Sequence, residues 1–490
     1  MLGFGKGRDT TMDAMSDNRQ VPLCIDLDGT LIATDTLWEG LISVLLKRPW
    51  LIFSAIAWAI AGKAVLKRQV AARLGHEGSD WPYRTEVIER INLARESGQP
   101  VWLVTGAAQS TATAIADHLG LFDRVLHSTD QENLTALRKR DRLLALCGDG
   151  GFDYVGNSRD DLAVFDSARR AIIVAPDAAA KRWGARHQSE MLPLAKVSPL
   201  AIFKSIRVHQ WLKNVLIAVP VVLNHELADT GLILAAFAAF FSFSFLASTV
   251  YIVNDISDLA NDRQHPRKRL RPLASGAVSL PVISVCAVVL LLASIALASL
   301  LPPLFWVVLA VYAAITTTYT FVLKRKLLVD VFTLAALYTV RIIAGAAATG
   351  TELSFWLLAF SIFFFLSLAL VKRFVELDEL ADDDATQLMG RSYVGGDKDM
   401  IAQAGIASAF SAAMVLALYV DSKEVASMYA QPWLLWPLCP LILYMLLRIW
   451  ILARRAQMHE DPVVFIMRDW RSQLATFSGA ALVILATVQV

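Results

Sequence analysis

Long apolar runs recur from about residue 200 to the end of the chain. When helical, a run of about 20 apolar residues spans the hydrocarbon core of a bilayer. The chain of 490 residues is 56% hydrophobic and has a mean hydropathy of +0.50. We therefore expect the C-terminal part to be an all-α integral membrane bundle of nine transmembrane helices, at 212–227, 231–252, 281–301, 303–323, 328–350, 354–371, 402–420, 432–453 and 474–490.

Basic residues gather in alternate loops between these runs. Lys324-Arg325-Lys326 and Arg454-Arg455 follow even-numbered runs, whereas the other loops are short and carry few charges. Because cytoplasmic loops are enriched in Lys and Arg, the pattern predicts an inner-membrane protein whose basic loops and N-terminal domain face the cytoplasm. The net charge of +2 gives no sign of a nucleic-acid partner.

The stretch 251–276, which follows the second run, concentrates charge of both signs. Asp255, Asp258 and Asp262 are spaced to share one face of a helix. Crowded carboxylates suit Mg²⁺, which in turn binds substrate phosphates. Four basic residues that can clamp phosphate follow Pro266, namely Arg267, Lys268, Arg269 and Arg271. The alternative for these four is a juxtamembrane loop that obeys the positive-inside rule, but such a loop needs no acidic stripe.

A second acidic motif follows the sixth run. Lys372, Glu376 and Glu379 are spaced one turn apart, and runs two and six thus end alike. Two acidic helix ends facing each other across a bundle could hold two Mg²⁺ ions and a pyrophosphate. Within the fifth run, Arg341 is expected to face a cavity or a partner. The alternative is a structural pair between Arg341 and Asp330.

The N-terminal part carries a different set of polar residues. An apolar strand over 21–25 ends in Asp26 and Asp28, whose side chains point the same way from the strand end. One carboxylate can be a nucleophile and the other a general acid or base. Polar residues that accompany later strands and a basic helix are Thr105, Lys139 and Asp161.

This set resembles the haloacid dehalogenase (HAD) superfamily of aspartate-nucleophile phosphatases over roughly residues 20–190, with four motifs in the family's order. The resemblance implies an α/β Rossmann-like domain in which Asp26 attacks phosphorus and Asp28 protonates the leaving group. By the same resemblance, Thr105 and Lys139 hold phosphoryl oxygens, and Asp26 with Asp161 ligates Mg²⁺. One departure is Asn157, which stands where the family has Asp after Gly and lacks its charge; Asp160 is a candidate to compensate. The alternative is a degenerate, non-catalytic domain.

A helical insertion at roughly 36–95 separates the first two motifs and resembles a cap over the site. It contains an apolar run at 50–61 that is too short to span a bilayer and is flanked by Lys47-Arg48 and Lys63. Two interpretations stay open. The run is either a buried cap helix or a helix in the lipid interface, for which tryptophans and basic flanks are typical.

The C-terminal part resembles the UbiA prenyltransferase superfamily. The motif NDxxDxxxD after the second run and an acidic motif after the sixth carry the likeness. A closer resemblance, to the decaprenyl-phosphate phosphoribosyltransferase branch, rests on five motifs: RVHQWLKN (207–214), NDxxDxxxDxxHPxKRxRPxxxG (254–276), LKRKLLVDVF (323–332), KRFVEL (372–377) and GRSY (390–393).

That branch transfers 5-phosphoribose from phosphoribosyl pyrophosphate to a polyprenyl phosphate. The resemblance implies Mg²⁺ on Asp255, Asp258 and Asp262, with Glu376 joining the metal or positioning the ribose. Residues implied to bind phosphates of the donor or of the lipid are Lys213, Lys268, Arg269, Arg271, Arg341, Lys372 and Arg373. The product keeps a 5-phosphate, which the fused phosphatase domain is expected to remove.

Two rival functions remain open at this stage. One is an aromatic prenyltransferase that uses a prenyl diphosphate, and the other is a non-catalytic membrane protein with a decayed phosphatase domain. The expected domains are a disordered lead-in at 1–19, the HAD-like domain at 20–195 and the membrane domain at 196–490. Four scattered cysteines predict neither a disulfide framework nor a zinc site.

Overall fold

The computed structural model describes residues 21–73, 81–129, 133–192, 199–224, 228–265, 268–379, 388, 391–458 and 461–487. The predicted lead-in at 1–19 lies outside this range. The chain forms two compact units. Unit 1 comprises the described residues up to Ser205 together with Ile252–Cys286, and unit 2 comprises Ile206–Tyr251 with Ala287–Val490.

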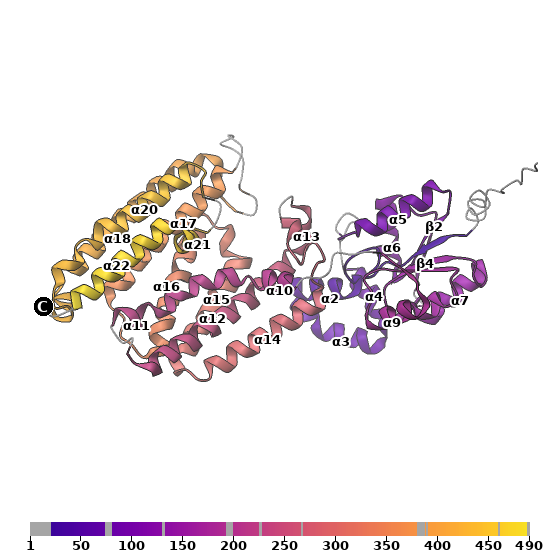
Figure 1. Ribbon diagram of the computed structural model, residues 1–490, viewed down its shortest axis with the longest axis horizontal. Coiled ribbons are helices and arrows are strands. Elements are labelled where there is room, and N and C mark those ends of the chain that lie inside the picture. Colours follow the sequence, from indigo (N-terminus) through magenta and orange to yellow (C-terminus); the bar gives the residue numbers. More distant parts are fainter. Residues whose placement is uncertain are drawn as a thin grey trace, which may run out of the picture. The chain divides into compact units, whose positions relative to one another are not determined.

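Unit 1 is built on a parallel sheet of six strands in the order β3-β2-β1-β4-β5-β6 (Figure 1). The strands are β1 (Leu23–Ile25), β2 (Val101–Ala108), β3 (Arg124–Ser128), β4 (Asp153–Gly156), β5 (Arg170–Ile173) and β6 (Glu190–Met191). Apolar residues alternate between the two faces, so Leu23 and Ile25 enter one hydrophobic core and Cys24 enters the other. This confirms the predicted parallel α/β sheet. It also places the end of β1 in the middle of the sheet.

Helices cover both faces of this sheet, as a parallel sheet requires. One core includes residues of α5 (Thr85–Glu96) and α6 (Gln109–Leu119). The other includes residues of α7 (Ala136–Cys147), α8 (Leu162–Phe165) and α9 (Ala178–His187). The helices and strands thus bury the sheet on both sides and leave its strand ends to carry polar groups.

The insertion after β1 is helical, as predicted. It contains α2 (Thr36–Lys47), η1 (Pro49–Leu51), α3 (Ile52–Ala61) and α4 (Lys63–Ala71). Asp35 caps α2 by accepting hydrogen bonds from the amides of Leu37 and Trp38. Gly62 separates α3 from α4 with a φ of 122°, which favours glycine. Both α2 and α3 pack against α4.

The segment Ile252–Cys286 belongs to unit 1. It contains the end of α12 (Thr230–Ser257), α13 (Leu259–Gln264), η5 (Lys268–Leu270) and the start of α14 (Leu280–Ala298). Arg263 forms a largely buried ion pair with Glu39 of α2 at 2.5 Å. At Gly276, whose φ is 75°, a Cβ would come within 2.5 Å of the Ala33 side chain.

Unit 2 is helical. Its remaining helices are η4 (Val208–Ala218), α11 (Val219–Leu223), α15 (Pro303–Phe321), α16 (Val329–Thr349), α17 (Phe355–Asp378), α18 (Lys398–Val420), α19 (Lys423–Met428), α20 (Leu438–Arg454), α21 (Pro462–Arg468) and α22 (Trp470–Thr487). Within the described residues, seven helices are long and apolar enough to cross a membrane. An eighth span is counted if Leu200–Ile206 and Val208–Leu223, bent by 48°, form one.

Nine spans are therefore not confirmed. The predicted first span corresponds to part of the bent pair, and the bend lies at Arg207, whose φ is 57°. The predicted last span corresponds to α22, which is not among the seven because its first turn is polar and lowers its mean hydropathy. Residues 225–227 and 488–490 of these two predicted spans lie outside the described part of the chain.

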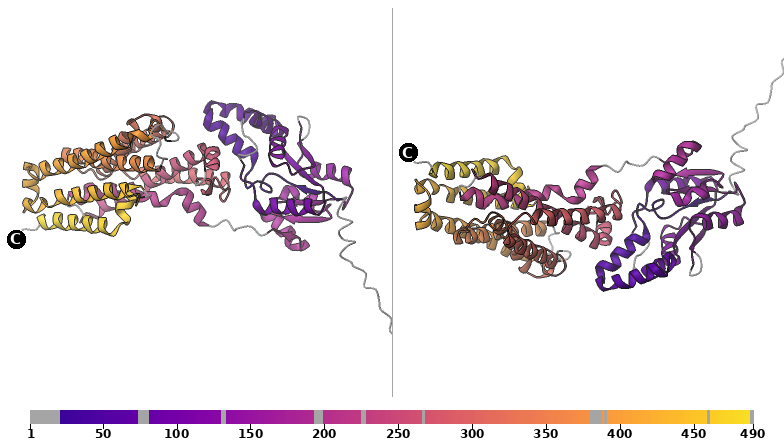
Figure 2. Two further views of the ribbon diagram at one scale, coloured as in Figure 1. Left: turned by 90° about the horizontal axis from the view of Figure 1, so that it is seen from above. Right: turned by 90° about the horizontal axis from the view of Figure 1, so that it is seen from below.

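Close helix packing holds unit 2 together. α17, α18 and α20 pack against one another, and the orange and yellow helices run alongside each other in both views of Figure 2. A Cβ at Gly405 of α18 would come within 1.9 Å of the Trp450 ring of α20. Trp450 also donates a hydrogen bond to Ser367 of α17, at 3.1 Å. Small residues let membrane helices approach in this way.

Candidate functional sites

The end of β1 opens into a pocket of about 610 Å³, here named the sheet-edge pocket. Its lining includes Asp26, Asp28, Lys139 and Asp161, which the sequence predicted to act together. These residues come from the ends of β1 and β4 and from α7. Parallel strands end at the same edge of a sheet, and this topology gathers residues that lie more than 100 positions apart in the sequence.

Lys139 is the centre of the sheet-edge pocket. Its Nζ atom donates hydrogen bonds to Asp26 Oδ1 at 2.7 Å, to Tyr154 Oη at 2.8 Å and to Asp161 Oδ1 at 3.3 Å. All four side chains are buried. Burial alone would lower the pKa of the Lys139 ammonium, but the charges of Asp26 and Asp161 raise it above its ordinary value. Lys139 is therefore a fixed positive charge beside the predicted nucleophile.

Asp161 is held in place from several sides. Its Oδ2 atom accepts hydrogen bonds from the amides of Asn157 and Ser158, both at 3.1 Å. Tyr154 Oη donates to its Oδ1 atom at 2.7 Å. Burial opposes ionisation of this carboxyl, but Lys139, Tyr154 and the two amides together lower its pKa. Asp161 is therefore ionised in the folded chain at neutral pH.

Asp28 has a different environment from Asp26. Its Oδ1 atom accepts a hydrogen bond from the amide of Thr36 at 2.8 Å. Burial, and next the nearby charge of Asp35, raise the pKa of Asp28 to about 6. A carboxyl with a raised pKa suits the predicted general acid. Burial also raises the pKa of Asp26, to about 7, although the charge of Lys139 lowers it, so the roles of the two aspartates rest on their positions and not on their pKa values. Thr105 is fully buried, and its hydroxyl accepts a hydrogen bond from the amide of Ala107, while Gly106 lines the pocket.

The donor set of the sheet-edge pocket fits a hard divalent cation. Asp26 and Asp161 bring carboxylate oxygens to one positive group, Lys139 Nζ, within 3.3 Å. Asn157 lies next to them, since a Cβ on Gly29 would come within 2.2 Å of its side-chain nitrogen. Among the described residues, no three His, Cys, Asp or Glu side chains are already gathered in metal-binding geometry.

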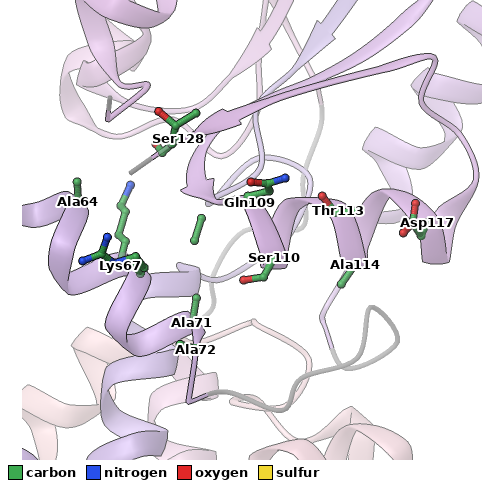
Figure 3. Close-up of a pocket in the computed structure, with 13 residues that line it drawn as sticks. Ala64, Lys67, Ala71, Ala72, Gln109, Ser110, Thr113, Ala114, Asp117 and Ser128 are labelled. Carbon is green, nitrogen blue, oxygen red and sulfur yellow. The ribbon is translucent and has the colours of Figure 1, made fainter. Parts of the chain in front are cut away.

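A second hollow, here named the cap hollow, lies between α4 and α6 (Figure 3). Its volume is about 1110 Å³, and Figure 3 shows alanines of α4 facing Ser110 and Thr113 of α6 across it. Lys67 lines both this hollow and the sheet-edge pocket, so the two adjoin there. Its Nζ atom donates to the carbonyl of Gly106 at 2.5 Å. Sequence reasoning did not single out Lys67.

The predicted aspartate stripe lies where α12 meets α13. Asp258 directly precedes α13 without a capping hydrogen bond from its side chain. The amide of Asp258 donates to the carbonyl of Asn254, and the amide of Asp262 donates to the carbonyl of Asp258, which continues the helical pattern across the junction. Arg271 Nη1 contacts Asp262 at 2.6 Å and Asp255 at 3.4 Å. The carboxylates of Asp255 and Asp262 therefore converge on one cationic group. Such a donor set also fits a divalent cation.

The basic residues of this segment differ in placement. Arg271 is partly buried against the aspartates, whereas Lys268 and Arg269 are exposed on η5. Pro266 and Arg267 lie outside the described residues. Of the predicted phosphate clamp, the structure thus brings one member to the aspartates and leaves two with solvent-accessible side chains.

Unit 2 contains a buried charged group, here named the Asp461 cluster. Lys213 of η4 contacts Asp461 at 2.6 Å, and Lys372 of α17 contacts the same carboxylate at 3.6 Å. Tyr338 of α16 donates to Asp461 at 3.0 Å. Burial opposes ionisation of Asp461, but Lys213 and Lys372 lower the pKa of its carboxyl well below the ordinary value. The cluster carries two basic groups and one acidic group.

An apolar cavity of about 460 Å³ begins next to the Asp461 cluster. Leu216 lines it three residues after Lys213, and Val463 lines it two residues after Asp461. Phe360, Phe364 and other apolar residues of α17, α18 and α20 complete the lining. Residues close in sequence to Lys213 and Asp461 thus line a largely apolar cavity of unit 2.

A further ion group surrounds Arg373 and is here named the Arg373 cluster. Arg373 is fully buried and pairs with Asp330 at 2.5 Å and with Glu376. Arg391 contacts Glu376 at 3.3 Å and Asp330 at 3.4 Å. Tyr393 donates to Asp330 at 2.5 Å. The guanidinium of Arg373 is thus engaged by two carboxylates inside the protein.

Arg341 does not pair with Asp330, so that alternative is wrong. Asp330 instead faces Arg373, and Arg341 donates to the Asn214 side chain at 2.8 Å. Arg341 also donates to Tyr312 Oη at 3.1 Å. Asn214 follows Lys213 in the sequence, so this hydrogen bond places Arg341 close to Lys213. Arg341 also lies on the same side of α16 as Tyr338, whose ring centroid is 5.7 Å from the guanidinium.

Sequence reasoning missed Asp461, whose carboxylate contacts both Lys213 and Lys372. Asp461 directly precedes Pro462 and caps α21 through the amide of Val463. An Asp before a Pro is a common signal for the start of a helix. This explanation is sufficient for Asp461 in the sequence, so its pairing with the two lysines was not predicted. Tyr154 was missed for a similar reason, because it lies within a strand that reads as core.

The comparisons with known proteins match two parts of the chain to two different families. Residues 215–471 match the UbiA prenyltransferase family, and residues 23–165 match haloacid dehalogenase-like hydrolases. The chain is 36% identical over 458 residues to "Uncharacterized protein y4nM" of Sinorhizobium fredii. This match covers 92% of this chain and 88% of that protein. It is 34% identical over 289 residues to nodulation protein NoeC of Azorhizobium caulinodans, over 59% of this chain and 93% of that protein.

A third similarity is more limited in extent. The chain is 39% identical over 185 residues to a decaprenyl-phosphate phosphoribosyltransferase of Mycobacterium tuberculosis. The match covers 36% of this chain and 60% of that protein.

Proposed function

Because the chain belongs to the UbiA prenyltransferase family and carries a haloacid dehalogenase-like domain, we propose that it makes a lipid-linked ribose in two steps. In the first, 5-phosphoribose passes from phosphoribosyl pyrophosphate to a polyprenyl phosphate. In the second, the N-terminal domain removes the 5-phosphate of the lipid-linked product. The similarity to decaprenyl-phosphate phosphoribosyltransferase supports this choice of substrates.

The observation that carries the proposal is the Asp461 cluster with its adjoining apolar cavity. Two lysines and one aspartate leave a net positive charge for a phosphate monoester, and the cavity accepts part of the polyprenyl chain. In this proposal Lys213 and Lys372 bind the lipid phosphate. Arg341 and Tyr338 support them from α16.

The transfer step is a displacement at the anomeric carbon of the donor. An oxygen of the lipid phosphate forms a bond to C1 of the ribose while the bond from C1 to the pyrophosphate oxygen breaks. The lipid phosphate is already anionic, so no strong general base is needed. Asp255, Asp258 and Asp262 would hold Mg²⁺, which when bound supplies positive charge to the leaving pyrophosphate.

Basic side chains share the work of binding the donor. Lys268, Arg269 and Arg271 are proposed to bind its phosphates. Arg373 is proposed to act mainly by positioning Glu376, because its guanidinium is buried between carboxylates. Glu376 then positions the ribose or contributes a carboxylate to the metal.

The dephosphorylation step is proposed to use the sheet-edge pocket. A carboxylate oxygen of Asp26 attacks the phosphorus of the 5-phosphate, and Asp28 gives a proton to the departing ribose hydroxyl. Asp28 then takes a proton from the water that hydrolyses the aspartyl phosphate. Lys139 and Thr105 are proposed to hold the phosphoryl oxygens, and Asp26 and Asp161 would hold Mg²⁺, whose charge assists them when bound.

One assay tests the proposed substrates. Membranes that contain the chain are supplied with labelled phosphoribosyl pyrophosphate and a polyprenyl phosphate, and in parallel with a prenyl diphosphate and an aromatic acceptor. The proposal expects label in the lipid fraction only from the first pair. Product from the second pair alone would favour an aromatic prenyltransferase instead.

We also propose that the chain lies in the inner membrane with its basic loops in the cytoplasm. Ser422 and Gln457 flank α20, and Ser279 precedes α14. In single-cysteine variants, an impermeant thiol reagent applied from the periplasm should label a cysteine at 422 and not at 279 or 457. Labelling of both groups from one side would contradict the proposed sidedness.

A further inference from the structure

The helix α3 presents a bare apolar face. Exposed fractions are 47% for Ile52, 78% for Phe53, 55% for Ile56 and 82% for Ile60. At about 100° per residue these four side chains occupy an arc of about 100° on one side of the helix. We call this arc the α3 face. Ala55, on the other side, is buried.

The rest of α3 is committed to unit 1. The helix packs against α4, and Trp58 lies under the guanidinium of Arg73 at 4.6 Å. One side of α3 is therefore packed against unit 1, and the α3 face on the other side is left uncovered. Trp50, 69% exposed, extends the apolar surface at the start of the helix. Contiguous exposed apolar surface of this kind marks an interaction site.

The charges around α3 identify the partner. From residue 40 to residue 76 the chain contains six Lys or Arg and no Asp or Glu. Arg48 and Lys63 lie at the two ends of the apolar segment, and Arg68 is exposed on α4. A second copy of this surface would bring like charges together. An anionic lipid headgroup layer would be attracted, and the same chain contains helices long and apolar enough to cross a membrane.

We infer that the α3 face docks into the interfacial region of the bilayer. The helix of ten residues is about 15 Å long, half the thickness of the hydrocarbon core, so it lies in the membrane plane and does not cross it. Its apolar residues enter the acyl boundary, Trp50 sits at headgroup level, and the flanking basic residues contact lipid phosphates. This resolves the two interpretations of 50–61 in favour of the lipid interface.

Docking of α3 has a consequence for the sheet-edge pocket. Only Gly62 separates α3 from α4, and α4 supplies Lys63 and Lys67 to that pocket. A membrane-bound α3 therefore holds two pocket lysines within a few residues of the lipid headgroups. A phosphomonoester on a lipid headgroup is then favoured over the same group free in solution. This consequence rests on the proposed phosphatase function, whereas the docking itself does not.

Spin labels test the docking directly in the full chain reconstituted in nanodiscs that contain phosphatidylglycerol. The native cysteines are replaced, and a nitroxide is placed at Phe53→Cys, Ile56→Cys or Ile60→Cys. The matched control is Leu93→Cys on α5, which is 57% exposed and lies well apart from α3 in Figure 1. The ratio of relaxation by oxygen to relaxation by a water-soluble nickel chelate reports depth in the bilayer.

We expect this ratio to be about tenfold higher at the three α3 positions than at Leu93. In Phe53→Glu/Ile60→Glu, the label at Ile56→Cys should fall to the ratio of the control. Two results overturn the inference. One is a ratio at α3 equal to that at Leu93, and the other is shielding from both reagents, which indicates docking on protein.

A second readout separates docking from the phosphatase function. The Phe53→Glu/Ile60→Glu variant should hydrolyse a small soluble phosphomonoester at the wild-type rate and a lipid-linked one about tenfold more slowly. Leu93→Glu should leave both rates unchanged. If neither substrate is hydrolysed by the wild type, the proposed function fails while the spin-label result still decides the docking. If the variant hydrolyses both at wild-type rates, the consequence for the pocket is wrong.

Discussion

The sheet-edge pocket and the Asp461 cluster both place lysine ammonium groups against buried aspartates, but the chain builds them by opposite routes. In the sheet-edge pocket, Lys139 lies between two carboxylates at 2.7 and 3.3 Å. In the Asp461 cluster, one carboxylate lies between two lysines at 2.6 and 3.6 Å. The first group has an excess of negative charge and suits a metal and a nucleophile. The second has an excess of positive charge and suits an anion.

The two groups also differ in how their positions are fixed. A parallel sheet brings strand ends to one edge, and residues there are fixed by strand order and by short turns. In the helical bundle, Lys213 and Asp461 are 248 positions apart and meet only because η4, α16, α17 and α21 pack together. The residues of a site at a strand end can therefore be recognised from local motifs, whereas the residues of a site inside a bundle are brought together only by tertiary packing.

The largest expected effect is loss of phosphatase activity in Asp26→Asn. Asn is nearly isosteric but cannot form the aspartyl phosphate, so hydrolysis of a soluble phosphomonoester should fall by roughly 10⁴-fold. Transfer of labelled phosphoribose to lipid, measured on the same preparation, should stay near wild type. Asp141→Asn, on the exposed face of α7, serves as the control. Loss of both activities in Asp26→Asn would contradict the separation of the two sites.

The next largest effect concerns the aspartate stripe. Asp255→Asn or Asp258→Asn should reduce transfer by about 10²- to 10³-fold at limiting Mg²⁺, because each removes a charge that supports the leaving pyrophosphate. Phosphatase activity on the soluble substrate should be unchanged. Initial rates across a Mg²⁺ titration provide the measurement. Wild-type transfer in either variant at limiting Mg²⁺ would show that the metal assignment is wrong.

A smaller effect is expected on stability. Asp461→Asn leaves the buried Lys213 and the partly exposed Lys372 without their counter-charge, which should cost about 3 kcal/mol of unfolding free energy, mainly through Lys213. Asp469→Asn is the matched comparison, because Asp469 also caps a helix and pairs with Arg448 at 2.6 Å, while its side chain is 14% exposed against 8% for Asp461. It should cost about 1 kcal/mol. Equal losses, measured by unfolding in detergent, would remove the distinction between the two.

The smallest expected effect is a pH dependence in unit 1. Burial opposes ionisation of Asp153, but Arg169, Arg170 and Gln99 lower the pKa of its carboxyl. A lowered pKa contributes stability above the unfolded value of about 3.9 and loses it as pH falls toward the folded value. Because both arginines are partly exposed, the contribution is about 1 kcal/mol or less at pH 7.

Heat inactivation of the phosphatase measures this contribution. Wild type should outlast Asp153→Asn at pH 7, and the difference should shrink as pH falls below about 4, where the carboxyl of the unfolded chain takes up a proton before that of the folded chain. A difference that stays constant with pH would mean that the charge of Asp153 contributes nothing.

The residues predicted for the sheet-edge pocket sit in sequence motifs, which made them recognisable without the structure. Asp26, Lys139 and Asp161 were each identified before the structure, and the structure brings them together. The helical bundle was predicted as an architecture, but not its buried pairs. The sequence pattern suggested Asp330 as a partner of Arg341, whereas in the structure Arg341 donates a hydrogen bond to Asn214. The directions of the side chains and the rotation of the helices decide this partner. Asp461 reads as an ordinary helix cap, and only packing reveals the two lysines beside it.

The predicted boundaries of the membrane helices rest on apolar composition alone, which limits their accuracy. The run at 212–227 overlaps a 3₁₀ segment, Val208–Ala218, and a bend precedes it at Arg207; hydropathy detects neither feature. The helix α22 begins at Trp470 with a polar turn, four residues before the predicted run at 474–490. The exposed α3 face, by contrast, was visible as a short apolar run, but its orientation could not be read before the helix was packed against α4.

Mass spectrometry of lipid products tests the central claim most directly. Purified wild type and Asp26→Asn, in nanodiscs without other phosphatases, receive phosphoribosyl pyrophosphate, Mg²⁺ and a polyprenyl phosphate. The account predicts mainly polyprenyl-phosphoryl ribose from wild type, and from Asp26→Asn the same lipid carrying one additional phosphate. Absence of any ribosylated lipid from both proteins, or the same ratio of the two lipids from both, would contradict it.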